Sequence, residues 1–131
     1  MKLNDLLNAN DALKTLTGKR FTSYKKARLL VKLRKAVETE IEFYTEEERK
    51  AIKTYAELNE KGNPVFLPDG RLRLKDEQAK TAFESEIAKL RDSDVDGIET
   101  VTLSENDFIS AEELPTPEEM LLLESLVEFT D

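Results

Sequence analysis

A long stretch without glycine or proline constrains the fold of this chain more than any other feature. It runs from about Thr22 to Glu60. Five residues recur in it at every seventh position: Leu30, Val37, Tyr44, Ala51 and Leu58. A repeat of this kind is typical of a helix that packs along another helix. The helix would be roughly 55 to 60 Å long at about 1.5 Å per residue, and it would need a partner along its length. We therefore predict a long helix with a coiled-coil-like seam.

The residues that follow predict a second helix beside the first. Thr45 begins a Thr-Glu-Glu-Glu sequence that fits a capping box, so we expect a break or bend there. Pro68-Asp69-Gly70 separates two short apolar runs and predicts a β-hairpin, because proline presets φ and glycine tolerates a positive φ. Asp76 can cap a helix that ends near Arg91 and folds back on the first. Residues 22–92 are thus predicted to form a long antiparallel helical hairpin with a small β-hairpin at its tip.

Both ends of the chain carry shorter predicted elements. Residues 1–18 predict short N-terminal helices, with Asn4 and Asn10 as caps. Residues 93–131 predict an acidic C-terminal segment of one strand and helices. In that segment Thr116 begins a capping box with proline at the first helical position, and the final helix that follows is apolar on more than one side. A chain of 131 residues with 39% hydrophobic residues can bury one modest core, so we expect a single domain of the α+β class, mainly α.

Several classes of chemistry are excluded by composition. The chain has no Cys, His or Trp, which removes thiol nucleophiles, histidine acid–base catalysis and Cys/His zinc sites. Its glutamate clusters are the usual solvated faces of helices, and no nucleophile arrangement accompanies them. We expect no enzymatic activity and no cofactor. No apolar run fits a signal peptide or a membrane span, so we expect a soluble intracellular protein without a membrane partner.

Charge is distributed unevenly along the chain. Residues 1–36 hold ten Lys and Arg against two acids, whereas residues 92–131 hold thirteen acids and no base. Such asymmetry is typical of a charged partner, of docking within the chain, or of both. The basic patch comprises Lys19, Arg20, Lys25, Lys26, Arg28 and Lys32. It could bind phosphates, but the acidic third of the same chain would compete, so we do not expect a nucleic acid partner.

An acidic turn raises the question of a calcium site. Asp92, Asp94, Asp96 and Gly97 match the first positions of an EF-hand loop. The acid required at position 12 is missing, because Leu103 stands there. A short acidic turn at the end of a helix is the commoner cause of this pattern, and we prefer that interpretation.

The leucine-rich C-terminal segment is the predicted partner-binding surface. So many apolar side chains this late in the chain need a surface that covers them, either the core or another protein. The candidate residues are Met120, Leu121, Leu122, Leu123, Leu126 and Val127.

Four blocks of the sequence resemble a known family. They are "MKLNDLLNANDALKTL", "KARLLVKLRKAVETEIEFYTEEERKAIKTYA", the hairpin region, and "LSENDFISAEELPTPEEMLLLESLVE". In this order they resemble a family of small proteins, a domain of unknown function, encoded by phages and prophages of Gram-positive bacteria. The resemblance covers nearly the whole chain and implies a biological setting. It implies no catalytic or ligand-binding residues, and the aspartate string is not part of it.

Two hypotheses for function follow. The first is a non-enzymatic phage protein that binds other proteins, as a virion (tail or head) assembly or accessory factor, and that self-associates through the seam or the leucine-rich segment. The second is an acidic inhibitor or regulator of a host protein, with a DNA-mimic-like or anti-defence role. Either would act in the host cytoplasm, and the first also in the virion. The partner, the stage of the phage cycle and the oligomeric state stay open, as does docking of the acidic third on the basic third.

Overall fold

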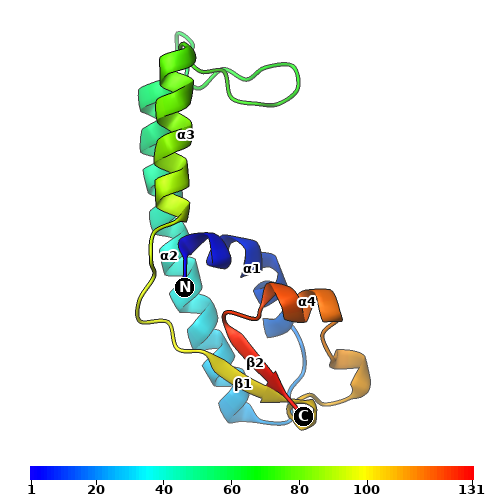
Figure 1. Ribbon diagram of the computed structural model, residues 1–131. Coiled ribbons are helices and arrows are strands. Elements are labelled where there is room, and N and C mark those ends of the chain that lie inside the picture. The colour runs from blue at the N-terminus through cyan, green and yellow to red at the C-terminus, as the bar shows by residue number, and fades with distance from the viewer. The chain divides into compact units, whose positions relative to one another are not determined.

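The computed structural model describes residues 1–131 and is mainly helical (Figure 1). Its elements, in chain order, are α1 (Leu3–Thr17), α2 (Tyr24–Tyr55), α3 (Glu77–Arg91), β1 (Val101–Ser104), two 3-10 turns (Glu105–Asp107 and Ala111–Glu113), α4 (Pro117–Leu122) and β2 (Val127–Thr130). The backbone falls into two compact units. Unit 1 is Met1–Ile41 with Asp94–Asp131, and unit 2 is Glu42–Ser93. The expected α+β, mainly α class agrees with this content, and the single domain stays a prediction.

Unit 1 encloses the main core of the chain. Helix α1 buries one apolar face, and the first half of α2 buries Leu30, Leu33 and Val37. The C-terminal segment contributes the remaining buried apolar side chains: Val101, Leu103, Phe108, Leu123, Leu126 and Val127. No charged or polar side chain is buried with them. The acidic C-terminal third therefore does pack on the N-terminal third, mainly through apolar contacts. Two of its carboxylates also take part, since Asp94 pairs with Lys2 and Glu113 accepts a hydrogen bond from the backbone N–H of Arg20.

Helix α1 differs from the expected pair of short helices. It is one continuous helix of 15 residues. Its buried residues share one face: Leu3, Leu6, Ala9, Ala12, Leu13 and Leu16. Spacings of three and four residues keep these side chains on a single stripe, so packing of that stripe continues the helix through Asn10. The Asp5 carboxylate accepts a hydrogen bond from the backbone N–H of Lys2 (2.9 Å) and caps the first turn.

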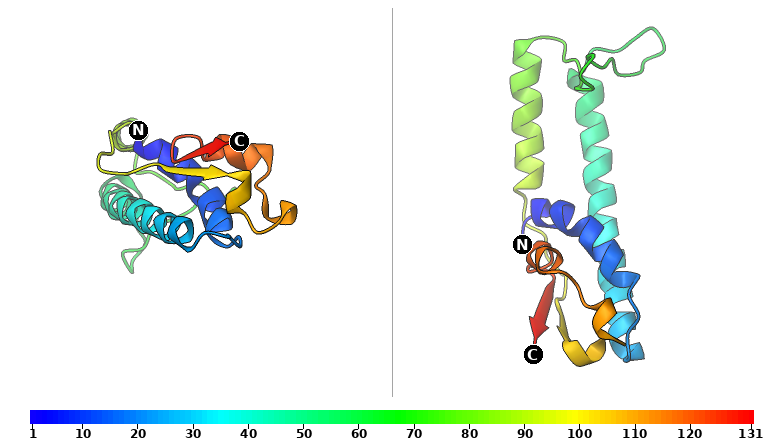
Figure 2. Two further views of the ribbon diagram at one scale, coloured as in Figure 1. Left: turned by 90° about the horizontal axis from the view of Figure 1, so that it is seen from below. Right: turned by 90° about the vertical axis from the view of Figure 1, so that its right-hand side faces the viewer.

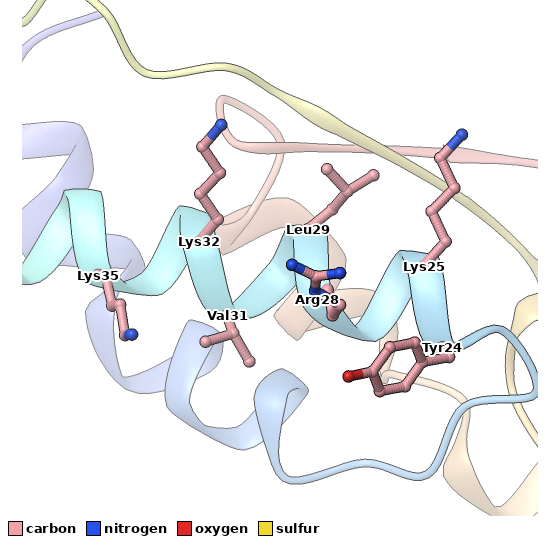
Figure 3. A pocket seen from close by; sticks show the side chains of 7 residues that line it. All are labelled: Tyr24, Lys25, Arg28, Leu29, Val31, Lys32 and Lys35. Atoms are coloured by element: carbon pink, nitrogen blue, oxygen red, sulfur yellow. The ribbon is translucent and has the colours of Figure 1, made fainter.

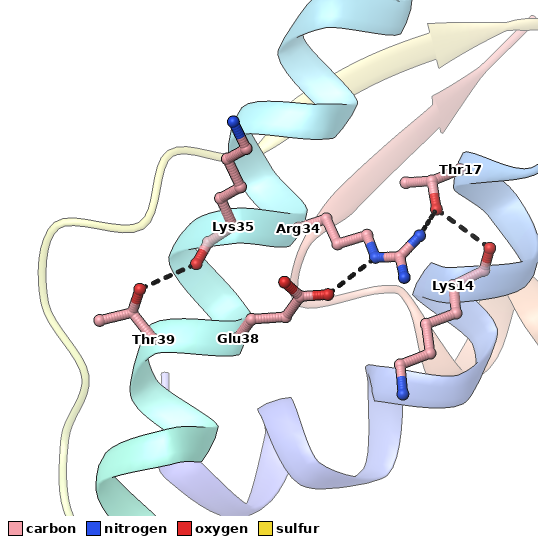
Figure 4. Close-up of polar contacts among 6 residues, drawn as sticks. All are labelled: Lys14, Thr17, Arg34, Lys35, Glu38 and Thr39. Carbon is pink, nitrogen blue, oxygen red and sulfur yellow. Dashed lines mark hydrogen bonds and ion pairs between the residues drawn. The ribbon is translucent and has the colours of Figure 1, made fainter.

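Hydrogen bonds join α1 to α2 on the inner side of unit 1 (Figure 4). The Arg34 guanidinium donates to the Thr17 hydroxyl at 2.8 Å and to the Glu38 carboxylate at 2.9 Å. Thr17 in turn donates to the backbone carbonyl of Lys14 at 3.0 Å. Arg34 thus serves the fold, since it links the end of α1 to the middle of α2.

The two strands form a parallel pair, which the sequence did not predict. Val101 lies opposite Val127, and Ser104 lies opposite Thr130. The expected strand near residues 98–103 is present as β1. The expected final helix begins where predicted but is shorter than expected, because α4 ends at Leu122 and the chain turns into β2. Pairing with β1 satisfies the backbone of β2 and buries Val127, and these tertiary gains outweigh the helical preference of the leucine-rich run.

Unit 2 contains the second half of α2, the connecting segment and α3. The Arg91 side chain donates to the Tyr44 hydroxyl at 3.2 Å, and the Tyr55 hydroxyl donates to the Glu86 carboxylate at 2.9 Å. The order of these contacts means that the two helical segments run in opposite directions, as the right-hand view of Figure 2 shows. Helix α2 continues through Thr45, so the predicted break there is wrong. Asp76 caps α3 as predicted, accepting from the backbone N–H of Ala79 at 2.7 Å.

The segment between α2 and α3 turns at the predicted place but forms no regular β-hairpin. Gly70 has a φ of 86°, and Phe66 and Leu72 form a single antiparallel bridge across the turn. Two more isolated bridges join Ala56 to Leu74 and Leu58 to Pro64. Proline has no backbone N–H to donate to a strand ladder, and two prolines lie in this segment, which helps to explain why no ladder extends. The only ladder in the structure is the parallel one.

Candidate functional site

The outer face of α2 in unit 1 carries a groove (Figure 3). Its volume is about 630 Å³. Seven residues of one helix line it: Tyr24, Lys25, Arg28, Leu29, Val31, Lys32 and Lys35. We call these residues the α2 groove. In Figure 3 Tyr24 and Val31 project to one side of the helix and Lys25 and Lys32 to the other. Leu29 lies on the side of Lys25 and Lys32, and Lys35 lies on the side of Tyr24 and Val31, so both sides of the α2 groove carry apolar and basic groups.

The apolar side chains of the α2 groove are unusually open to solvent. The side chain of Tyr24 is 79% exposed and that of Val31 is 49% exposed. They lie seven residues apart, which is about two helical turns or roughly 10 Å at 1.5 Å per residue. Leu30 and Leu33, on the opposite side of the same helix, are almost fully buried. One face of α2 thus serves the core, and the other presents large apolar groups to solvent, which is typical of an interaction surface.

The cations of the α2 groove have no ion-pair partner. Arg28 lies over the Tyr24 ring, with its guanidinium carbon 5.9 Å from the ring centre. Lys25, Lys32 and Lys35 form no salt bridge. Four uncompensated positive charges within twelve residues create a local positive potential that attracts an acidic group.

A smaller groove adjoins the first. Its volume is about 190 Å³, and it shares Leu29 and Lys32 with the α2 groove. Its far wall is formed by Gly97, Glu99 and neighbouring residues that lead into β1. The two grooves together extend from α2 to the segment that leads into β1.

The predicted basic patch divides into two groups. Lys25, Arg28 and Lys32 lie in the α2 groove. Lys26 instead donates to the backbone carbonyl of Thr102, and Lys19 and Arg20 precede the helix. The backbone N–H of Arg20 donates to the Glu113 carboxylate at 3.0 Å. Sequence inspection therefore found most of the groove cations but missed the apolar Leu29 and Val31. The seven-residue spacing of Tyr24 and Val31 would have revealed Val31, whereas no such spacing indicates Leu29.

Three of the six predicted partner-binding residues are part of the core. Leu123 and Leu126 are fully buried, and Val127 is 2% exposed in β2. Met120 is half-buried. Only Leu121, at 68%, and Leu122, at 42%, remain exposed. Leu123, Leu126 and Val127 cannot contact a partner without unfolding of unit 1. The predicted partner-binding surface is therefore limited to the exposed face of α4. Most of the predicted heptad seam is likewise buried within the chain: Leu30, Val37, Tyr44 and Ala51.

The aspartates of the acidic turn take up structural contacts. Asp94 forms an ion pair with Lys2 (3.1 Å), and these two residues also form an isolated antiparallel bridge. Asp92 is the C-cap of α3. Gly97 has a φ of 79°, which suits a tight turn. No group of three or more acidic side chains in the structure is arranged to hold a metal ion.

Three titratable groups in unit 2 have shifted pKa values. Burial raises the pKa of Tyr44, and its hydrogen bond to Glu48 (2.7 Å) raises that pKa further. The hydrogen bond to Glu86 raises the pKa of Tyr55. Hydrogen bonds from the backbone and side chain of Arg71 lower the pKa of Asp69. All three shifts move the group away from neutral pH, the reverse of what general acid–base catalysis needs.

Comparison with protein-family models, with curated proteins and with solved structures finds no match to this chain. None of its helices has the length and apolar character that crossing a membrane requires.

Proposed function

We propose that this chain is a non-enzymatic protein that binds other proteins, as an assembly or accessory factor of a phage virion. The phage or prophage setting rests on the sequence resemblance. In this proposal the protein acts in the host cytoplasm and then with the tail or head. The long helical hairpin expected from the sequence belongs to the same proposal, with α2 as the arm that carries the binding groove.

The α2 groove is the observation that carries the proposal. Exposure of the apolar groups of Tyr24 and Val31 to water is unfavourable. Contact with the apolar side chains of a partner would remove this area from water and so favour binding. Lys25, Arg28, Lys32 and Lys35 surround them and form no salt bridge. A segment with apolar side chains between carboxylates would satisfy both features at once, which is the chemistry of an amphipathic acidic helix laid along a groove.

The shifted pKa values mark none of the three groups of unit 2 as a general acid or base. Tyr44, Tyr55 and Asp69 are each explained by a hydrogen-bonded neighbour or by burial, and none is moved toward the pH at which proton transfer is efficient.

A pull-down with matched variants tests the proposed function. Tagged protein is recovered from phage-infected or prophage-induced cells at low and at high salt, and its partners are identified by mass spectrometry. We expect tail, capsid or packaging proteins with the unmodified chain and their loss with Arg28→Glu/Lys32→Glu. The control Lys61→Glu/Lys80→Glu makes the same change in net charge at exposed positions of unit 2 and should retain them. Capture that is equal in both variants would contradict the assignment of the α2 groove.

A second candidate function is the acidic inhibitor of a host protein. The observation that favours it is that almost all carboxylates in residues 94–131 lack a salt bridge. Asp94 with Lys2 is the one salt bridge of this segment, and the segment contains no Lys or Arg. Such a surface can dock on a basic host protein or imitate the charge of DNA. This candidate predicts a host protein that is captured at low salt, is lost at high salt, and is lost with Glu112→Lys/Glu128→Lys but not with Arg28→Glu/Lys32→Glu.

A further inference from the structure

Unit 1 carries a second exposed surface whose chemistry is the opposite of the α2 groove. Glu118, Leu121 and Leu122 occupy positions i, i+3 and i+4 of α4, and Glu124 follows the helix. We call these four residues the α4 surface. Leu121 is 68% exposed, and only Tyr24 exceeds it among the exposed large hydrophobic side chains of unit 1. Glu118 and Glu124 are exposed and form no salt bridge. The α4 surface is therefore acidic and apolar, where the α2 groove is basic and apolar.

We propose that the α2 groove of one copy of this protein binds the α4 surface of a second copy. The inference rests on the proposed protein-binding role of the groove and names its occupant. Leu121 and Leu122 would cover Tyr24 and Val31, while Glu118 and Glu124 would lie against the cations of the groove.

Charge selects this pairing over the two symmetric ones. Groove against groove would bring four cations of one copy against four of the other, and α4 against α4 would bring carboxylates together. Both arrangements are repulsive, since each group would lose water without gaining an opposite charge. Groove against α4 pairs opposite charges and apolar groups in one contact. Residues 92–131 hold no base at all, so the carboxylates of the α4 surface find no cation among their sequence neighbours.

The dimensions of the two surfaces agree. Helix α4 has six residues and is therefore about 9 Å long at 1.5 Å per residue. Tyr24 and Val31 are seven residues apart on α2, or roughly 10 Å. The short helix can thus lie across the two turns that separate these side chains. Because each surface is small, we expect association to become evident only on the order of 10 to 100 µM.

The proposed contact joins different surfaces of the two copies. In a pair joined this way, one copy retains a free α4 surface and the other a free α2 groove, so a contact of this heterologous kind can repeat into rings or filaments. Assembly of many copies would suit a factor that acts while a virion is built.

Sedimentation velocity of the purified full chain tests this inference without any other protein. The concentration series covers the unmodified chain, Arg28→Glu/Lys32→Glu, Glu118→Lys/Glu124→Lys, an equimolar mixture of these two variants, and the control Lys61→Glu/Lys80→Glu. Circular dichroism and thermal melting verify that each variant folds. We expect the unmodified chain and the control to associate, and each variant alone to associate at least about tenfold more weakly.

The mixture is the decisive sample. In it the unchanged groove of one variant meets the unchanged α4 surface of the other, and the two reversed surfaces also carry opposite charges, so we expect association to return. A monomer at every concentration, a mixture that stays dissociated, or variants that associate like the unmodified chain would each overturn the inference.

Two further outcomes assign the groove to another occupant and also overturn it. One is binding of a labelled 20-nucleotide oligonucleotide that Arg28→Glu/Lys32→Glu abolishes. The other is an unmodified chain that stays monomeric yet loses its virion partner with Arg28→Glu/Lys32→Glu. The second outcome leaves the proposed function intact. Conversely, if the chain self-associates as expected but captures no virion protein through the α2 groove in the pull-down, the virion role alone is contradicted.

Discussion

The two units of this protein are stabilised in different ways. Unit 1 contains all of the buried apolar side chains except Tyr44, Ala51 and Ala56, which belong to unit 2. Helix α3 has no buried residue at all. Its contacts with α2 include the aromatic and polar ones of Tyr44 with Arg91 and of Tyr55 with Glu86 and Phe83. Since burial of apolar area is the main stabilising term in folding, unit 1 should be the stable part of the chain, and unit 2 should open first.

The largest effect is expected from truncating the core of unit 1. Leu16 is fully buried in α1, so Leu16→Ala removes its transfer free energy and leaves a cavity. We expect a loss of about 2 to 5 kcal/mol in the free energy of unfolding, measured by urea denaturation. The control Leu121→Ala alters an exposed leucine and should change it by less than about 0.5 kcal/mol. Equal losses in the two variants would contradict the burial of α1.

Hydrogen exchange should separate the two units directly. The amides of α3 should exchange at least about tenfold faster than those of α1, which corresponds to a difference of about 1.4 kcal/mol in opening free energy. Exchange followed by NMR or mass spectrometry at one pH measures this ratio. Protection of α3 equal to that of α1 would mean that unit 2 is stabilised by contacts beyond those described above.

Removal of one hydroxyl tests how far unit 2 depends on polar contacts. The Tyr44 hydroxyl donates to Glu48 and accepts from Arg91. Tyr44→Phe keeps the ring and deletes both hydrogen bonds, so we expect a loss of about 1 kcal/mol. The loss should appear as faster exchange in α3, with the amides of α1 unaffected. Tyr24→Phe, at an exposed tyrosine of unit 1, is the matched control and should have no measurable effect.

The smallest effect is expected on the stability of unit 2 at acid pH. The folded-state pKa of Asp69 lies below its ordinary value of 3.8, because the backbone and side chain of Arg71 donate to its carboxylate. The contribution of this group to stability is therefore present above about pH 3.8 and is lost as the pH falls through the lower folded-state pKa. NMR titration should give a higher Asp69 pKa in Arg71→Gln than in the unmodified chain. An unchanged pKa would refute the role of the Arg71 side chain.

Local signals in the sequence predicted the caps of two helices and part of the buried face of a third. Asp76 caps α3, and Thr116 caps α4 with Pro117 at its first position and Glu119 reaching back, as expected from their residue types. The burial of Leu30 and Val37 follows from their seven-residue spacing. These features depend on residues a few positions apart, which is why one sequence is enough to predict them.

Contacts between distant residues were not predictable in this way. The run from Met120 to Phe129 has no period that separates helix from strand, and β2 forms because Val127 meets Val101 across a long connection. For the same reason the residues of the candidate site could be predicted only in part. Sequence shows that Lys25, Lys26 and Arg28 are basic, but only the rotation of α2 against the core decides that Lys26 meets Thr102 while the other two line the groove.

The discontinuity of unit 1 has a consequence for how the protein is made. Unit 2 is one uninterrupted segment, so all of its residues leave the ribosome before residues 94–131. The core of unit 1 needs Leu123, Leu126 and Val127, and these are synthesised after all of unit 2. During synthesis α1 must therefore expose its leucine face until the last strand arrives, and contacts so distant in sequence form slowly. The part of the chain with the greatest final stability is the part that spends longest unprotected on the ribosome, where chaperones that hold leucine-rich segments would find it.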